Sequence, residues 1–217
     1  MEKKVENLEN FKKAITSTIK SIIGDQNIDV TFGREVTKKN INVINLPNIQ
    51  SIDNKIDYIE TRALADTEAL KLRCSDINIY NSFEPKGNIS KLLYAAAEKI
   101  RCENIGSSYF KGIKENLNKY YKIKIKEKKN YENNDYEFVD AFENYLRNKI
   151  FKLNNEKELE NKYKKKLDAK LKSKLDLLNS SILDQKKFDS LISRIISEMQ
   201  IDKSKEYDEK DDKHKNE

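Results

Sequence analysis

Residues 62–76 read RALADTEALKLRCSD, and residues 98–106 read EKIRCENIG. Both stretches place charged side chains among Ala, Leu and Ile. Arg62 and Asp66 are four residues apart, so they share one face if the stretch is helical. A charge among packed apolar side chains is costly unless it has a partner. The two stretches therefore predict helices that pack together and carry a paired, partly buried polar network.

The second stretch repeats this spacing at Glu98 and Arg101, three residues apart. Three interpretations stay open: a buried ion-pair network between helices, a face for a partner protein, or an acid/base pair formed by Glu98 and Glu103. Five positions separate these two glutamates by about 140° around a helix, which disfavours shared catalysis. We predict no catalytic, cofactor-binding or metal-ligating residue, but a structural or partner-contact network of eight residues: Arg62, Asp66, Arg73, Asp76, Glu98, Arg101, Glu103 and Asn116.

Hydrophobic periodicity predicts a mainly α fold, a multi-helix domain with a small two-stranded β element near the N-terminus. Gly24 is expected to end the first helix, and Gly106 and Gly112 to bracket a kink or a close helix approach. Residues 122–135 are predicted to be a loop. The expected strands are 28–33 and 41–46, and the expected helices are 5–23, 53–83, 88–106, a helix after Gly112, 136–153, 156–178 and 183–199.

Residues 1–200 are predicted to form the helical domain. Residues 201–217 carry many charges and one aromatic residue, Tyr207, and are predicted to be a disordered tail.

The composition is lean in apolar residues, with 37% hydrophobic and 37% charged, and a net charge of +6. A basic body permits acidic partners, nucleic acid included, without demanding them. Residues 120–131 interleave Lys with Tyr, a mixture that can bind phosphates and bases. Nearby Glu and Asp residues dilute this patch, so nucleic-acid binding is disfavoured but stays as the rival function.

Two cysteines, Cys74 and Cys102, lie far apart, and the only histidine is His214. This pattern argues against a disulfide scaffold and against a transition-metal site. The sequence has no Gly-rich phosphate loop, so any ATP is expected on another polypeptide. No apolar run approaches the ~18 residues of a membrane helix, and the first residues lack an apolar signal core. We therefore expect a cytoplasmic protein that does not interact with membranes.

The charged stretches also carry a family resemblance. From Arg62 the pattern is R-x-x-A-D-x-x-A-L-x-L-R-C-x-D, and from Glu98 it is E-x-x-R-x-E-x-I-G-x-x-x-x-x-G-x-x-x-N-L. In this order and spacing the series resembles the N-terminal region of the CobT subunit of the aerobic, ATP-dependent cobaltochelatase. Further matching pieces are Phe11-Lys-Lys-Ala14, Ile23-Gly24-Asp25, Val30-Thr31-Phe32, Leu46-Pro47 and Leu183-Asp184-Gln185-Lys-Lys-Phe188.

The chain also departs from that family. Ser75 stands where the family usually has His, Ala63 where it commonly has Gly, and Lys99 where it has Gln. The family continues through an acidic linker into a von Willebrand A-type domain, whose D-x-S-x-S string is absent here. The resemblance therefore predicts an N-terminal fragment, or a split or truncated gene product.

The resemblance implies a part in cobalt insertion into hydrogenobyrinic acid a,c-diamide during cobalamin biosynthesis, a ligase reaction that forms nitrogen–metal bonds. In that family a large chelatase subunit binds the tetrapyrrole and cobalt, and an AAA+ ATPase subunit supplies hydrolysis. ATP, Mg²⁺ and cobalt are thus expected on partner subunits. This chain is expected to be an accessory, non-catalytic module that docks on the ATPase, with homo-oligomerisation left open. The alternative is a basic nucleic-acid-binding protein or an adaptor for another AAA+ partner.

Overall fold

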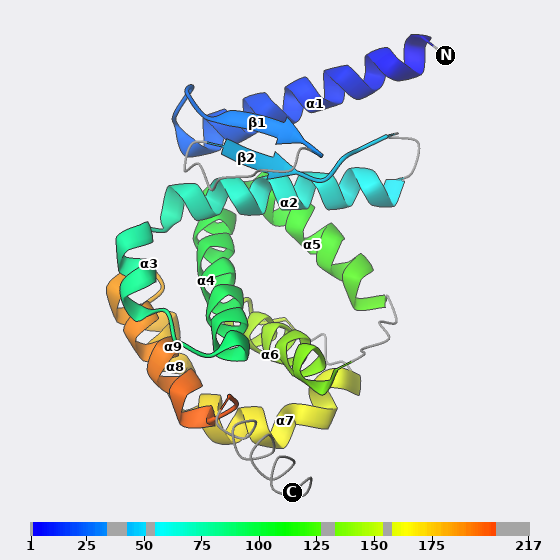
Figure 1. Ribbon diagram of the computed structural model, residues 1–217. Coiled ribbons are helices and arrows are strands. Elements are labelled where there is room, and N and C mark those ends of the chain that lie inside the picture. The colour runs from blue at the N-terminus through cyan, green and yellow to red at the C-terminus, as the bar shows by residue number, and fades with distance from the viewer. Residues whose placement is uncertain (1, 34–42, 51–54, 127–132, 154–157, 203–217) are drawn as a thin grey trace, which may run out of the picture. The chain divides into compact units, whose positions relative to one another are not determined.

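The computed structural model is mainly helical, with a two-stranded sheet near the N-terminus among the residues that it describes (Figure 1). The predicted fold class is confirmed. The described residues are 2–33, 43–50, 55–126, 133–153 and 158–202. The chain divides into two compact units, unit 1 (Met1–Cys74 and Ile105–Lys128) and unit 2 (Ser75–Asn104 and Lys129–Glu217). The predicted tail from residue 203 onward lies outside the described residues.

Helix α1 (Glu2–Ile23) opens unit 1 and ends where the sequence predicts. Gly24 has a φ of +80°, and its N–H donates to the Lys20 carbonyl oxygen at 2.9 Å. A left-handed residue that closes such a bond is a common helix stop, and glycine adopts it without a Cβ penalty. The prediction for Gly24 is confirmed.

The small sheet pairs β1 (Asp29–Phe32) with β2 (Val43–Leu46) in parallel, with Asp29 opposite Val43. Both strands fall within the predicted ranges. Two strands are marginally stable alone and need a packing partner. β2 supplies two buried side chains, Ile44 and Leu46, and contacts helix α2 (Lys55–Cys74).

Helix α2 is the central element of unit 1, because it contacts α1, β2 and α5 (Lys111–Lys126). Its buried face includes Ala63, Ala65 and Ala69, whose small side chains let neighbouring elements approach closely. α5 runs to Lys126, so the prediction of a loop from residue 122 is wrong at its start. The apolar positions of α5 continue the helical spacing past Tyr121, and this periodicity outweighs the Lys-rich composition.

The single helix predicted over residues 53–83 is two helices, α2 and α3 (Ile77–Phe83). The break lies at Asp76, whose backbone is extended, with φ −84° and ψ 120°. Its side chain accepts hydrogen bonds from the N–H groups of Asn78 at 2.8 Å and Ile79 at 3.3 Å. Asp76 is therefore the N-cap of a new helix. The predicted cap at Asp53 lies outside the described residues.

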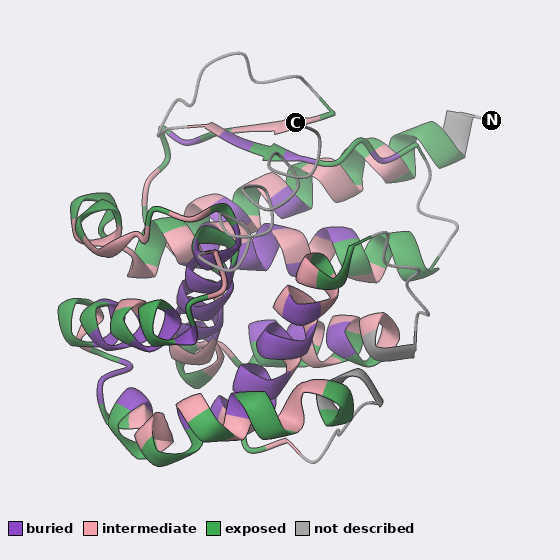
Figure 2. Cartoon of the chain, turned by 60° about the horizontal axis from the view of Figure 1, so that its bottom comes forward, coloured by how far each residue is buried: buried purple, intermediate pink, exposed green. Residues whose placement is uncertain are grey.

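Unit 2 is built around α4 (Asn88–Tyr109), along which buried positions concentrate (Figure 2). The division between the units falls within this helix. The predicted helix over residues 156–178 is interrupted by a 3₁₀ turn, η1. The other elements of unit 2 are α6 (Asn134–Ile150), α7 (Glu158–Leu171), η1 (Lys172–Lys174), α8 (Leu175–Ser180) and α9 (Gln185–Met199).

The start of α4 is capped from a distant part of the chain. The carboxylate of Asp202 accepts from the N–H groups of Ile89 and Ser90, each at 3.1 Å, and from the Ser90 hydroxyl. The prediction that Asn88 or Ser90 caps this helix is therefore wrong. The distant carboxylate fits because Gly87 has no side chain: a Cβ there would lie 1.9 Å from an Asp202 oxygen.

Gly106 marks a close approach within unit 1. A Cβ at this position would lie 2.3 Å from a methyl carbon of Leu70, which is fully buried on α2. The predicted close approach is therefore confirmed at Gly106. At Gly112 a Cβ would meet nothing within 4 Å, so that glycine does not mark a second close contact.

These two glycines form a matched pair for a stability test. We expect Gly106→Ala to lower the free energy of unfolding by about 1–2 kcal/mol, because the cost of overpacking against Leu70 exceeds the better helix propensity of Ala. Gly112→Ala should leave stability unchanged or raise it by up to about 1 kcal/mol. Urea unfolding followed by circular dichroism measures both. Equal or greater stability of Gly106→Ala than wild type would contradict the packing argument.

Candidate functional site

The eight predicted residues lie in two groups, one in each unit. Their role as a structural or partner-contact network stays a prediction, but their contacts can be described. Unit 1 holds Arg62, Asp66, Arg73 and Asn116, and unit 2 holds Asp76, Glu98, Arg101 and Glu103.

In unit 1, Asp66 lies between a cation and an amide. Arg62 Nε is 3.7 Å from Asp66 Oδ1, and the Asn116 side-chain amide donates to Asp66 Oδ2 at 2.8 Å. Arg62 also donates to the Thr18 hydroxyl at 3.3 Å. Because Thr18 lies on α1, Arg62 and Asp66 on α2, and Asn116 on α5, this cluster connects three helices of the unit.

Asp66 is 1% exposed. Burial raises the pKa of its carboxyl, and the hydrogen bond from Asn116 and the charge of Arg62 partly oppose that rise. Removing either Arg62 or Asn116 would leave the buried Asp66 carboxylate with an unmatched oxygen, which would destabilise the packing of the three helices.

Arg73 closes the far end of α1. Its guanidinium donates to the backbone carbonyl of Ile22, in the last turn of that helix, and lies 5.6 Å from the centre of the Phe110 ring. The last carbonyls of a helix have no partner within the helix, so a cation there satisfies one of them.

In unit 2, Glu98 and Arg101 form a bidentate ion pair. Arg101 Nε donates to Glu98 Oε2 and Arg101 Nη2 donates to Glu98 Oε1, both at 2.7 Å. The side chains are almost fully enclosed, with 3% of Glu98 and 1% of Arg101 exposed. Arg101 Nη1 also donates to the Ile182 carbonyl at 3.1 Å, which connects α4 to the turn before α9.

Two motifs that are far apart in the sequence meet at this ion pair. The Ser75 hydroxyl donates to Glu98 Oε1 at 2.7 Å, and the Gln185 amide donates to Ser75 Oγ at 3.1 Å. The same amide group binds the backbone of Asp76, accepting from its N–H at 2.7 Å and donating to its carbonyl at 3.1 Å. Gln185 thereby fixes the start of α9 against the start of α3.

A further acidic residue beside Glu98, Asp189, was not predicted from the sequence. It lies on α9, is 0% exposed, and accepts from the Gln185 amide at 3.1 Å. Burial and, to a smaller extent, the charge of the neighbouring Glu98 carboxylate together raise the pKa of Asp189 to about 7. Two carboxylates at such a site favour one shared proton. The only sequence signal was that Asp189 directly follows Phe188, which belongs to the apolar face of an amphipathic helix.

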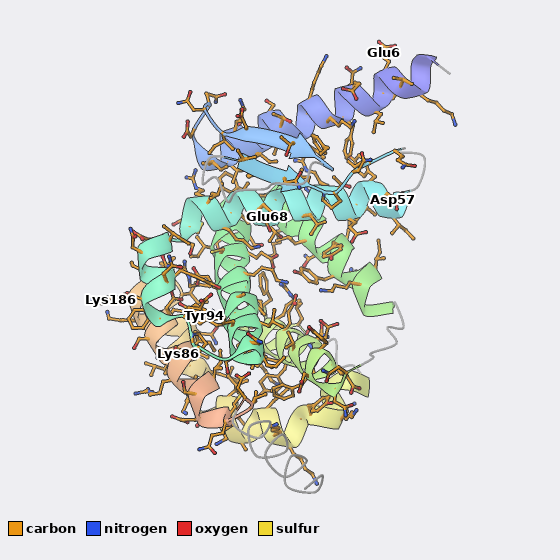
Figure 3. All side chains as sticks on the ribbon, viewed as in Figure 1. Glu6, Asp57, Glu68, Lys86, Tyr94 and Lys186 are labelled. Atoms are coloured by element: carbon orange, nitrogen blue, oxygen red, sulfur yellow. The ribbon has the colours of Figure 1, made fainter. Side chains whose placement is uncertain are left out.

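Two tyrosines adjoin this carboxyl pair. Tyr94 lies on α4 (Figure 3). Its hydroxyl donates to the Tyr80 carbonyl on α3 at 3.1 Å. Burial raises the pKa of Tyr80 to about 12, and burial together with the Asp189 charge raises the pKa of Tyr94. Both phenols therefore stay protonated at neutral pH.

Glu103 pairs with a second residue that the sequence did not single out. Arg147 Nη2 on α6 is 2.5 Å from Glu103 Oε2 and 3.7 Å from Glu143 Oε1. Lys99 adds a further bond across the two helices, donating to Glu143 at 2.7 Å. The four-residue spacing of Glu143 and Arg147 was the available signal. Glu98 and Glu103 thus pair with different arginines.

This arrangement suits a scaffold better than a reaction site. Glu98 is 3% exposed and Asp189 0% exposed, so neither carboxylate is open to a bound molecule in this structure. Within the described residues, no group of three or more His, Cys, Asp or Glu side chains is placed to hold a metal ion. What the cluster can do is hold α3, α4 and α9 together, because Arg101 and Gln185 each bind a backbone group of another segment and Ser75 binds Glu98.

The chain matches the family described as Cobalamin biosynthesis protein CobT over residues 5–217. It therefore belongs to the CobT family, and this membership implies a role in cobalamin biosynthesis. The resemblance noted in the sequence is confirmed. No solved structure matches the chain. In the part of the chain that the structure describes, no helix is both long and apolar enough to cross a membrane.

The carboxyl pair predicts a pH dependence of stability. The folded-state pKa of Asp189 is about 7, above its ordinary 3.8, so its contribution to stability is complete below about pH 4 and is lost as the pH rises through 7. Asp189→Asn removes this titration. We expect the stability of wild type relative to Asp189→Asn to fall by about 2 kcal/mol between pH 5 and pH 8.5. Urea unfolding at both pH values measures it, and parallel stability curves would refute the assignment.

The Glu98–Arg101 pair predicts a large effect of truncation. Arg101→Met leaves Glu98 buried without its cation and should cost about 3–5 kcal/mol of unfolding free energy. The double variant Arg101→Met, Glu98→Gln should recover part of that loss. Lys187→Met is the control, because Lys187 forms an exposed pair with Asp184 and such pairs contribute little. Thermal unfolding compares them, and equal losses for Arg101→Met and Lys187→Met would count against a buried pair.

Proposed function

We propose that this protein is an accessory, non-catalytic subunit of an ATP-dependent cobaltochelatase. It assists the insertion of cobalt into hydrogenobyrinic acid a,c-diamide and acts by docking on an AAA+ ATPase subunit. Membership of the CobT family supports the pathway. The observation that carries the accessory role is the burial of Glu98, Arg101 and Glu103, the charged residues of the family-like motif.

Burial bears on the role because chemistry on a bulky tetrapyrrole needs accessible groups. Here the motif charges bind one another: Glu98 binds Arg101 and Ser75, and Glu103 binds Arg147. A satisfied buried network rigidifies the elements that it joins. A rigid helical body can transmit a force from a motor subunit to a substrate-bearing subunit without bending. The large chelatase subunit would bind the tetrapyrrole and cobalt, and the ATPase would hold ATP and Mg²⁺.

Sedimentation velocity of the purified chain with the AAA+ ATPase subunit from the same source tests this function. We expect co-sedimentation in the presence of ATP and Mg²⁺ and a clear loss without nucleotide, because a module that follows a motor must distinguish its states. An unrelated AAA+ ring, run under the same conditions, is the control. Absence of association in every nucleotide state, or equal binding to the unrelated ring, would overturn the proposal.

A further inference from the structure

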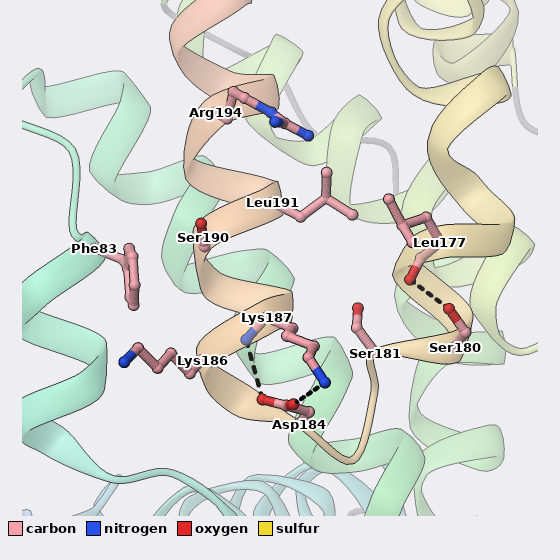
Figure 4. Close-up of a pocket in the computed structure, with 10 residues that line it drawn as sticks. All are labelled: Phe83, Leu177, Ser180, Ser181, Asp184, Lys186, Lys187, Ser190, Leu191 and Arg194. Atoms are coloured by element: carbon pink, nitrogen blue, oxygen red, sulfur yellow. Dashed lines mark hydrogen bonds and ion pairs between the residues drawn. The ribbon is translucent and has the colours of Figure 1, made fainter.

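A surface groove in unit 2 is formed by α3, α8, α9 and the turn between the last two. Its volume is about 690 Å³. Figure 4 shows the lining side chains, with Leu177 of α8 and Leu191 of α9 pointing toward one another and Lys186 extending toward Phe83 of α3. Openings of this size accept a ligand or a few side chains of a partner.

The floor of the groove is apolar, from Phe83, Leu177 and Leu191. Leu177 is 56% exposed, and Leu183, in the adjoining turn, is 77% exposed. Phe83 is half-buried and Leu191 is buried, so Leu177 is the exposed leucine of the floor and Leu183 lies beside the groove rather than in it. Exposed leucines next to a concave apolar floor are typical of interaction sites. Two of the lining hydroxyls bind the backbone of α8, since Ser180 donates to the Leu177 carbonyl and Ser181 to the Leu178 carbonyl, each at 2.9 Å.

The rim is cationic. Lys186, Lys187 and Arg194 line the groove together with one carboxylate, Asp184. Lys187 pairs with Asp184 at 2.8 Å. Among the described residues, neither Lys186 nor Arg194 forms an ion pair with a carboxylate. Two cations beside an apolar floor are complementary to an apolar segment that carries Asp or Glu at its edges.

The buried network holds the walls of this groove in place. Arg101 binds the Ile182 carbonyl in the turn between α8 and α9, and Gln185 binds the backbone of Asp76 at the start of α3. Ile182 directly follows the lining residue Ser181 in the sequence, and Gln185 lies between the lining residues Asp184 and Lys186. A preformed groove binds a partner with a smaller ordering cost than a surface that must rearrange.

We propose that this groove receives the AAA+ ATPase subunit, through an amphipathic segment of that subunit with apolar anchors flanked by carboxylates. The inference rests on the proposed function and adds the surface to it. Apolar anchors fill the space between Leu177 and Leu191, and the flanking carboxylates pair with Lys186 and Arg194. This is the helix-in-groove mode of recognition with a charged rim.

The test compares matched variants of the full chain for ATPase binding in ATP and Mg²⁺. Arg194→Glu and Leu177→Ser alter the groove. Lys165→Glu on α7 makes the same reversal of charge, and Leu92→Ser on α4 the same apolar-to-polar change, at exposed positions that do not line the groove. We expect each groove variant to weaken association about tenfold or more, and each control to leave it within about twofold. Circular dichroism confirms that all four variants are folded.

The outcomes separate the two proposals. If wild type binds the ATPase and the groove variants bind equally well, the groove inference is wrong and the proposed function stands. If wild type does not bind at all, both are overturned. If the groove variants lose binding to the large chelatase subunit or to a second copy of the chain but still bind the ATPase, the groove is also rejected as the ATPase site. Weakening of wild-type binding with added salt, absent in Arg194→Glu, would support the charged rim.

Discussion

The ion pair between Glu98 and Arg101 is the interaction on which the geometry of unit 2 depends. Its two side chains are buried, so each must be matched. Glu98 also accepts a hydrogen bond from the Ser75 hydroxyl, near the end of the 62–76 motif. Arg101 also donates to the carbonyl of Ile182, just before the 183–188 motif. Ser75, a departure from the family-like motif, donates to Glu98 in this chain.

Charged side chains in this CobT-family protein are paired in the interior of unit 2, whereas some at its surface are left exposed. Inside, Glu98 pairs with Arg101 and Glu103 with Arg147, and burial together with the Glu98 carboxylate raises the pKa of Asp189 to about 7. Outside, the groove between α8 and α9 keeps Leu177 and two of its cations, Lys186 and Arg194, exposed. A fixed interior with a basic groove at the surface supports the proposed docking role, since docking needs a fixed shape more than a reactive group.

Local patterns account for much of the fold and for part of the site. Helical periodicity located the main helices, and alternation located both strands, because each depends on residues within a few positions of one another. The pairs Arg62–Asp66 and Glu98–Arg101 were predictable from spacings of four and three residues. The helix break at Asp76 was missed because the apolar steps continue across it, while the cap depends on one extended residue.

The sequence by itself determined the helical class, the CobT-like motifs and the stop at Gly24. It left a kink or a close approach open at Gly106 and Gly112, and the structure shows a close approach at Gly106 alone. Only the tertiary structure decided which distant residues complete the polar network. Asp189, Arg147 and Asp202 each act on α4 from a separate helix or segment. Nothing in their own neighbourhood reveals this, because a buried charge is defined by the partner that packing brings to it, and packing depends on the whole chain.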